Sequence, residues 1–262
     1  MILKEVRCKT ALSPSGLYDY ALNPYRGCEH ACIYCYAPSI LRETRKWGNF
    51  VDVKVNISQV LKKELRRKKR GVVGIPTVTD AYQPVERRYE LTRKCLGELL
   101  KHDFPICIQT KSSLVLRDID LIKRFSQKEV GFTITTIDDS ARKKYEPRAS
   151  PVEERLSALE ELTEEGIDTW VFLGPIMPYI TNQGNDLENL IESIARVGVK
   201  TLLVDKMRMK PGLRPKMNAF YAEHCPELLP LFEVLTEDYY NKVKLEVTRL
   251  CRERGLKCEP CF

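Results

Sequence analysis

The chain has 262 residues, of which 43% are hydrophobic, 30% are charged and 8% are aromatic, and its formal net charge is +7. This composition excludes a disordered or collagen-like chain and is typical of a soluble globular protein. The longest apolar run, residues 170–180, is shorter than the ~20 residues that span a bilayer, and the start lacks a secretory signal. We therefore expect a cytoplasmic protein with no membrane partner.

Helical and strand-like patterns alternate along the chain. The expected strands are 17–22, 71–78, 105–109, 130–136, 169–177 and 200–205. The expected helices are 56–70, 86–102, 118–127, 151–165, 186–196 and a long amphipathic segment, 227–253. Regular alternation with short connections predicts an α/β fold of six parallel strands with right-handed crossovers. Periodicity alone leaves a closed barrel, a partial barrel and a doubly wound sheet open.

The domain organisation follows from the absence of repeats and of breaks in composition. We expect one folded unit, with the alternating strands and helices over residues 1–224. Residues 225–262 form a helical, cysteine-rich C-terminal extension that we expect to pack on the same domain.

Three of the ten cysteines, Cys28, Cys32 and Cys35, lie in one short segment after the first expected strand. Their spacing is C-x3-C-x2-C, which differs from the C-x2-C-x2-C run of bacterial ferredoxins. Three thiolates from one loop can hold three irons of a [4Fe–4S] cube and leave the fourth iron open to a cofactor or substrate. A zinc site normally needs a fourth ligand, which His30 inside the loop could supply.

With Tyr34 before the third cysteine, this segment resembles the signature of the radical S-adenosylmethionine (SAM) superfamily. The similarity extends to the spore photoproduct lyase-like branch, whose members are often labelled DNA repair photolyases. The segments that carry it are 23–37, 79–86, 110–122, 132–136 and 145–156. The resemblance implies a partial (β/α)6 TIM-like barrel with a [4Fe–4S] cluster on the three cysteines and SAM at its fourth iron.

The resemblance also implies an activity and an electron source. Superfamily members cleave SAM reductively to a 5′-deoxyadenosyl radical, which abstracts hydrogen from a substrate. An external flavodoxin- or ferredoxin-like donor would supply the electron. The SAM contacts implied by the matching motifs are Tyr34, Thr79, Asp80, Lys111 and Thr133.

Each of these contacts has its own expected role. Asp80 would accept a hydrogen bond from the SAM amino group, Lys111 would meet the SAM carboxylate, and Tyr34 would pack near the adenine. Glu146 and Arg155 match an EP…ER pattern that a structural ion pair explains as well as a ligand contact does.

One position departs from the lyase pattern. The lyases carry a hydrogen-donating cysteine three residues before the motif aspartate, and this chain has Thr77 there. Because an O–H bond is a poor hydrogen-atom donor, we expect a relative with a different substrate rather than spore photoproduct lyase itself.

The C-terminal cysteines form a second candidate metal site. Cys251, Cys258 and Cys261 follow a C-x6-C-x2-C spacing, and Cys225 could be a fourth ligand. An auxiliary iron–sulfur cluster, a structural zinc and free thiols all fit this spacing.

Two basic segments are candidates for contact with an anionic partner. Residues 62–70 are best explained as a solvated outer helix, whereas residues 206–216 follow the sixth strand and face the expected site.

Three functions remain open. They are a radical SAM enzyme acting on nucleic acid, one modifying a peptide or small molecule, and a non-catalytic, zinc-stabilised nucleic-acid-binding protein.

Overall fold

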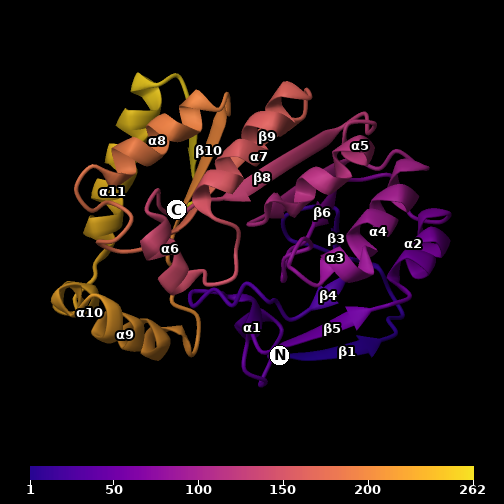
Figure 1. The fold of residues 1–262 in the computed structure, drawn as a ribbon, viewed down its shortest axis with the longest axis horizontal. Helices are drawn as coiled ribbons and strands as arrows, with labels where there is room; N and C mark the ends of the chain where they lie inside the picture. The colour runs from indigo at the N-terminus through magenta and orange to yellow at the C-terminus, as the bar shows by residue number, and fades with distance from the viewer.

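The centre of the molecule is an open eight-stranded sheet in the order β11-β10-β9-β8-β7-β6-β3-β2 (Figure 1). This computed structural model describes residues 1–262. The strands are β2 (Leu12–Ser13), β3 (Tyr20–Leu22), β6 (Val73–Ile75), β7 (Ile106–Thr110), β8 (Lys128–Thr133), β9 (Asp168–Ile176), β10 (Thr201–Lys206) and β11 (Lys257–Pro260). All neighbours pair in parallel except β2 and β3. The six expected strands are adjacent in chain order, which confirms the partial barrel.

Three parts of the strand pattern were not expected from the sequence, and the smallest is the two-residue strand β2 beside β3. The last strand, β11, pairs in parallel with β10 and so adds the chain end to the same sheet. A separate three-stranded sheet has the order β1-β5-β4, with β1 at Ile2–Val6, β4 at Tyr25–Arg26 and β5 at Phe50–Lys54. The antiparallel pairing of β4 with β5 fixes the chain just before Cys28.

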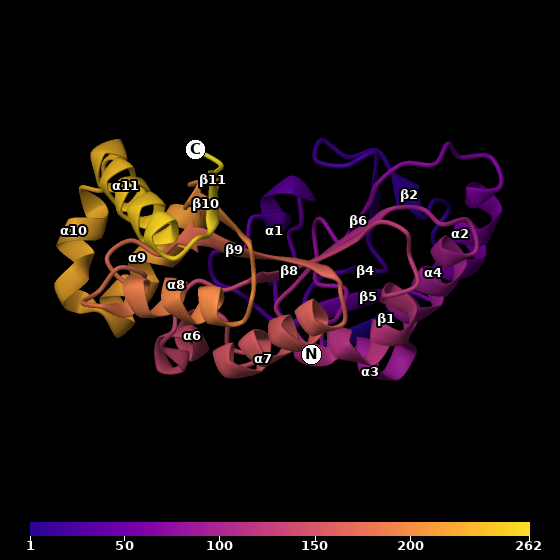
Figure 2. The ribbon, with the colours of Figure 1, turned by 90° about the horizontal axis from the view of Figure 1, so that it is seen from above.

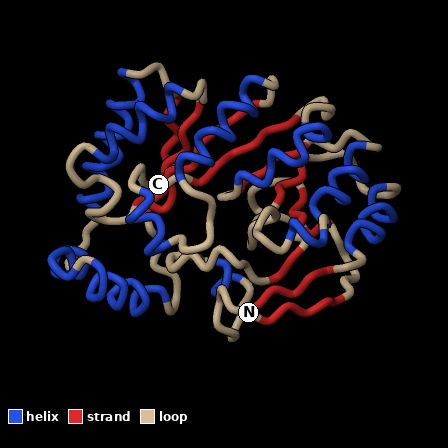
Figure 3. The backbone as a smooth tube through the Cα atoms, in the orientation of Figure 1, coloured by secondary structure: helices blue, strands red, loops and turns tan.

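Helices fill the connections between the strands (Figure 3). They are α1 (Ala37–Ile40), α2 (Ile57–Leu65), α3 (Glu86–Tyr89), α4 (Leu91–Leu100), the 3-10 turn η1 (Ser113–Asp118), α5 (Ile119–Ile122), α6 (Asp139–Tyr145), α7 (Val152–Glu164), α8 (Asp186–Arg196), α9 (Leu213–His224), the 3-10 turn η2 (Pro226–Leu228), α10 (Leu229–Glu233) and α11 (Glu237–Glu253). No helix combines the length and the apolar composition that a membrane span requires.

Two expected helices are each divided in the structure. The segment 86–102 splits into α3 and α4 at Glu90, whose backbone is left-handed with φ of 52°. The carboxylate of Glu86 accepts hydrogen bonds from the backbone N–H groups of Thr92 and Arg93, which caps the second helix. The segment 227–253 splits because Pro230 lies in the first turn of α10, which ends at Glu233, and Thr236 is extended before α11.

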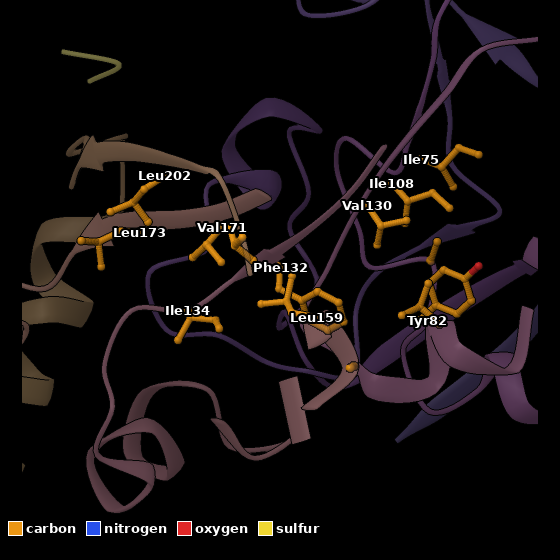
Figure 4. Packing of buried hydrophobic residues seen from close by; sticks show 14 of the residues in the cluster. Ile75, Tyr82, Ile108, Val130, Phe132, Ile134, Leu159, Val171, Leu173 and Leu202 are labelled. Atoms are coloured by element: carbon orange, nitrogen blue, oxygen red, sulfur yellow. The ribbon is translucent and has the colours of Figure 1, made fainter. Parts of the chain in front are cut away.

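The hydrophobic core lies between the sheet and the helices that cover its outer face. Figure 2 shows α7 and α8 on one side of the sheet and α1 on the other. The buried strand residues of this core include Ile75, Ile108, Val130, Val171 and Leu202 (Figure 4). Because successive strand residues point to opposite faces, the alternate residues face the inner side of the partial barrel. These inner-face residues include Gly74, Gln109, Gly131, Thr133, Trp170 and Phe172.

Candidate active site

The structure brings the expected cluster and SAM residues to one end of the sheet. The cysteine loop follows β4, Asp80 lies beyond the end of β6, Lys111 follows β7, and Thr133 is the last residue of β8. The carboxyl ends of parallel strands form the ligand-binding face of α/β barrels. The site expected from separate motifs is therefore a single region of the fold.

The three cysteines of this loop, which we call the cysteine triplet, are close enough for their charges to interact. Burial raises the pKa of the Cys28 thiol well above its usual value, and Asp80, Cys32 and Cys35 raise it further. Burial likewise raises the pKa of Cys32 to about 12, although Lys111 opposes this effect. Free thiols are costly to ionise in this place, so the loop suits a group that brings positive charge to the sulfurs.

Backbone geometry and buried side chains hold the triplet loop in place. Gly27 has φ of 90°, and a Cβ at this position would clash with the carbonyl and ring of Phe50, so glycine is required. The fully buried amide of Gln83 accepts a hydrogen bond from the Glu29 N–H at 2.8 Å and donates to the Gly27 carbonyl at 3.3 Å. These contacts tie the loop to the segment that follows β6.

From the other side, Arg148 donates to the backbone carbonyl oxygens of Glu29 and Gly48, at 3.3 and 2.8 Å. The triplet loop is therefore anchored to two separate connections of the barrel. These hydrogen bonds restrict the conformation of the loop backbone.

Asp80 is a buried carboxylate that accepts three hydrogen bonds. Its Oδ1 accepts from the Thr110 hydroxyl at 2.8 Å and from the Tyr82 N–H at 2.9 Å. Its Oδ2 accepts from the Lys111 N–H at 2.9 Å and lies 3.3 Å from Nδ1 of His30. Burial acts to raise the pKa of Asp80, but His30 and Lys111 outweigh it and hold the pKa below its usual value. Asp80 thus joins the ends of β6 and β7 and contacts the triplet loop.

A buried ion pair lies beneath the triplet. Nη2 of Arg155 lies 2.6 Å from Oε2 of Glu146, and neither side chain is exposed to solvent. The Tyr34 hydroxyl donates to the other oxygen of Glu146, and Arg155 donates to the carbonyl of Thr133 at 2.8 Å. The EP…ER pattern is therefore a structural ion pair that connects the triplet loop to the end of β8.

Lys111 is the cation nearest to this network. Its Nζ lies 5.8 Å from the ring centroid of Tyr34. Burial acts to lower the pKa of Lys111, but Cys32, Glu146 and Asp80 outweigh it and raise the pKa. Lys111 therefore stays charged and can meet an anionic group such as a carboxylate.

The two threonines of the expected SAM site have different surroundings. The Thr79 hydroxyl donates to the Gly27 carbonyl at 2.6 Å and accepts from Gln83 at 3.0 Å, so it is occupied within the loop contacts. The Thr133 hydroxyl, on the inner face of β8, accepts from the side-chain amide of Gln109 at 3.2 Å. Thr133 is thus the better placed of the two to meet a ligand inside the barrel.

The four C-terminal cysteines do not gather at one point. The buried Cys251 lies close to Cys258, and their interaction lowers the pKa of the Cys258 thiol. The charged groups that act on Cys225 are Lys144 and Glu227, and those that act on Cys261 are Asp205, Arg208 and Glu259. No three His, Cys, Asp or Glu side chains converge on a single metal ion anywhere in the chain. The three thiols of the cysteine triplet do not converge on one point either. This arrangement still fits a [4Fe–4S] cluster, because each thiolate of such a cluster binds a separate iron.

Comparison with known proteins connects this arrangement to a family. The model of the radical SAM superfamily matches residues 22–200, which include the triplet, Asp80, Lys111 and Thr133. The chain belongs to the radical SAM superfamily. Radical SAM proteins are enzymes that use an iron–sulfur cluster to cleave SAM, so a non-catalytic zinc protein is no longer an alternative.

Several relatives cover most of the chain. An uncharacterized protein of Methanocaldococcus jannaschii is 38% identical over 178 residues, which are 66% of this chain and 67% of the relative. An uncharacterized protein of Mycobacterium tuberculosis is 32% identical over 250 residues, which are 88% of this chain and 72% of the relative. A protein of Pseudomonas phage M6, described as a radical SAM Nalpha-GlyT isomerase, is 27% identical over 69% of this chain and 38% of its own length.

Solved structures of spore photoproduct lyase share the fold of this radical SAM enzyme. The lyase complexed with dinucleoside spore photoproduct matches 99% of this chain and 82% of its own, with a TM-score of 0.75 and 17% identity. A single-residue mutant of the lyase matches 99% of this chain and 81% of its own, with the same TM-score at 16% identity. At these identities the likeness confirms the open barrel and does not extend to the substrate.

Several residues that build the site escaped the sequence prediction. Gln83 and Glu29 fix the triplet loop, Arg148 reaches it from the far side, and Gln109 points into the barrel. Gln83 lies within the matching segment 79–86, so the motif contained a signal for it. The contact of Arg148 with Glu29 joins positions 119 residues apart, and no local pattern indicates it.

Proposed function

We propose that this radical SAM enzyme acts on a base of a nucleic acid. The relative from phage M6, described as a radical SAM Nalpha-GlyT isomerase, and the fold shared with a lyase complexed with dinucleoside spore photoproduct carry this proposal. The inner face of the barrel supports it. Cys28, Cys32 and Cys35 would hold the [4Fe–4S] cluster, with one thiolate for each of three irons.

The cofactors supply the radical chemistry, and the protein supplies position and charge. When bound, the cluster and SAM provide the one-electron cleavage that yields a 5′-deoxyadenosyl radical able to remove a hydrogen atom from the substrate. Lys111 would hold the carboxylate of SAM through its positive charge, and Thr133 would offer its hydroxyl from the end of β8. Asp80 would join the ends of β6 and β7, and its Oδ2, which accepts one hydrogen bond, would accept a second from the SAM amino group.

The inner face of the sheet has the chemistry to bind a planar, polar group. The ring of Trp170 packs against Gly131. A Cβ at position 131 would clash with this ring, so a glycine is needed there. Phe172 is half-buried and pairs in register with Thr133, whose hydroxyl meets the amide of Gln109. Aromatic rings stack on nucleobases, and an amide can hydrogen-bond to base edges.

The position of Thr77 distinguishes this chain from the photoproduct lyases. The Thr77 hydroxyl accepts a hydrogen bond from the side-chain amide of Asn23 at 3.2 Å, and no cysteine stands in its place. We therefore propose a reaction other than photoproduct reversal. The spacing of Cys225, Cys251, Cys258 and Cys261 predicts a second metal site, but these thiols do not lie together, so we propose a single cluster. The flavodoxin- or ferredoxin-like electron donor stays a prediction.

The direct test follows a hydrogen atom from substrate to cofactor. The enzyme is reconstituted without oxygen and incubated with SAM, dithionite and single-stranded DNA deuterated on its bases. We expect 5′-deoxyadenosine to form and to contain deuterium. Cys28→Ala should abolish both signals, whereas Cys225→Ala, a change of the same type outside the site, should leave both.

The isotope result also separates the remaining alternatives. 5′-Deoxyadenosine that forms without deuterium from DNA or from matching deuterated RNA would contradict a nucleic-acid substrate and favour a peptide or small molecule. No 5′-deoxyadenosine from a protein that holds its full complement of iron would contradict the proposed use of the cysteine triplet.

A further inference from the structure

We propose that a cationic groove beside Cys35 binds the phosphodiester backbone of the single-stranded nucleic acid whose base enters the barrel. This inference rests on the proposed function and adds where the substrate chain is held. We call the site the phosphate groove. Its volume is about 440 Å³, and the lining residues that matter are Cys35, Ser39, Arg42, Lys210, Gly212 and Lys216.

The groove lies between the triplet loop and the connection from β10 to α9. Cys35 forms part of its wall, and the charge of Lys216 acts on the Cys35 thiol. A ligand in this groove therefore lies directly beside the triplet. A chain anchored there stays close to the residues that would hold the cluster.

Not all basic residues of the segment 206–216 are available to a ligand. Lys206 pairs with Glu237 at 2.6 Å, and Arg208 pairs with Asp205 at 2.9 Å. Arg214 donates to the carbonyl of Phe232 at 3.2 Å. These three side chains hold the C-terminal helices and the chain end in place.

The remaining two basic residues of that segment line the groove. Lys210 and Lys216 are exposed, and neither side chain has a hydrogen-bond or ion-pair partner within the chain. Arg42, which reaches the groove from the end of α1, is also exposed and unpaired. Tertiary structure thus divides one basic segment into structural cations and free cations, and the free ones meet Arg42.

The groove keeps its positive charge because its one lining carboxylate is already neutralised. Glu43 lies 2.9 Å from Arg26 and 2.9 Å from Arg45. The lining therefore presents three uncompensated positive charges beside an ion-paired glutamate. Phosphate groups, each with one negative charge, suit such a lining.

The backbone around the groove supports the same conclusion. The backbone of Arg42 is left-handed, with φ of 47°. Residues other than glycine and asparagine rarely adopt this conformation unless the surrounding structure imposes it. Gly212 and Leu213, at the N-terminal end of the twelve-residue helix α9, also line the groove. The partial positive charge of a helix N-terminus favours anions.

The size of the groove suits single charged groups of a polymer. A concave site of about 440 Å³ is within the size range of sites for small groups, such as the successive phosphates of a nucleic acid chain.

The test measures binding and does not depend on turnover. Reconstituted wild type and the variant R42Q/K210Q/K216Q are titrated into a fluorescein-labelled single-stranded DNA of roughly 15 nucleotides, and into RNA of the same sequence, at several salt concentrations. We expect the variant to bind about 10- to 100-fold more weakly at 0.1 M salt. Its slope of log affinity against log salt should fall by about 2, since each lost phosphate contact contributes about 0.7.

The matched control removes three positive charges elsewhere. K62Q/K63Q/R67Q changes exposed residues in and just after α2, on the outside of the barrel, and should stay within about threefold of wild type. Iron content and the urea midpoint of every variant show that it is folded. The single variant K216Q, which should lower the slope by about 0.7, provides a milder second test.

Each outcome decides between the two proposals. Wild-type binding that all groove variants retain would overturn the phosphate groove and leave the proposed function in place. Wild-type protein that binds neither DNA nor RNA would overturn both. Groove variants that retain binding but accept electrons more slowly from an acidic flavodoxin would assign the groove to the electron donor and overturn this inference.

Discussion

The two cysteine-rich regions of this enzyme look equally like metal sites in the sequence, but they differ in how the fold surrounds them. Cys28, Cys32 and Cys35 lie on a loop that Gln83 and Arg148 hold from two separate connections. The C-terminal cysteines lie in or beside regular elements, where the pattern of a helix or a strand decides where each points.

The result is a common site in one region and scattered thiols in the other. On α11 and β11, Cys251 and Cys258 face each other, while Cys225 ends α9 and Cys261 lies beside Asp205. In this chain, the cysteines that lie together are those on a loop that contacts from distant segments fix in place. Variants in the two regions should accordingly behave differently.

The largest expected effect concerns iron. After anaerobic reconstitution, wild type should contain about four irons per chain, and a Cys28/Cys32/Cys35→Ala variant should contain essentially none. A Cys251/Cys258/Cys261→Ala variant should keep about four, because only Cys251 and Cys258 lie close enough to affect each other, whereas Cys225 and Cys261 lie among other charged groups. Iron and acid-labile sulfide analysis measures both. About eight irons in wild type, halved by either variant, would show instead that the C-terminal region also binds a cluster.

The next effect concerns the buried ion pair beneath the triplet. Arg155→Met leaves the buried carboxylate of Glu146 without its ion-pair partner, which should lower the free energy of unfolding by about 3–5 kcal/mol. Urea denaturation of the iron-free protein measures this. The matched control is Arg249→Met on α11, whose partner Glu253 is 48% exposed, and it should cost less than about 1 kcal/mol. Equal losses in the two variants would show that burial of the pair is unimportant.

The stability of the region beneath the triplet should depend on pH through Glu146. Arg155 and Lys111 outweigh the effect of burial and lower the pKa of Glu146 below its unfolded value of 4.5. A lowered carboxyl pKa gives stability that is fully present above pH 4.5 and is lost as the pH falls through the folded pKa. Stability of the iron-free protein should therefore fall as the pH drops below about 4.5, and Glu146→Gln should reduce this slope. An unchanged slope in Glu146→Gln would refute the assignment.

The smallest expected effects concern single C-terminal thiols. Cys251→Ala removes a fully buried sulfur and should lower the free energy of unfolding by about 1–2 kcal/mol. Cys225→Ala, at a half-buried position, should change it by less than about 0.5 kcal/mol. Neither variant should lose iron. A loss of iron from either would mean that these thiols bind the metal, as their spacing first indicated.

Local sequence patterns were sufficient for the six parallel strands and for the triplet. Six apolar runs separated by helical segments predict parallel strands with right-handed crossovers, but the order of the sheet followed from the resemblance to the family, because the pattern alone also fits a doubly wound sheet. The C-x3-C-x2-C spacing lies within one loop, so it is visible without the fold. The separate sheet formed by β1, β4 and β5 escaped prediction because β4 has only two residues.

Contacts between distant segments were decided by the tertiary structure alone. The sequence shows a Glu and an Arg nine positions apart, but only the fold reveals that both side chains are fully buried and pair beneath the triplet. In the same way, five basic residues between 206 and 216 look equivalent until Glu237, Asp205 and Phe232 engage three of them. Residue type and spacing thus determined the family, the cofactors and the barrel. Which charges are neutralised and which are free depends on partners far away in the chain, because electrostatic interactions depend on distance in space and on burial.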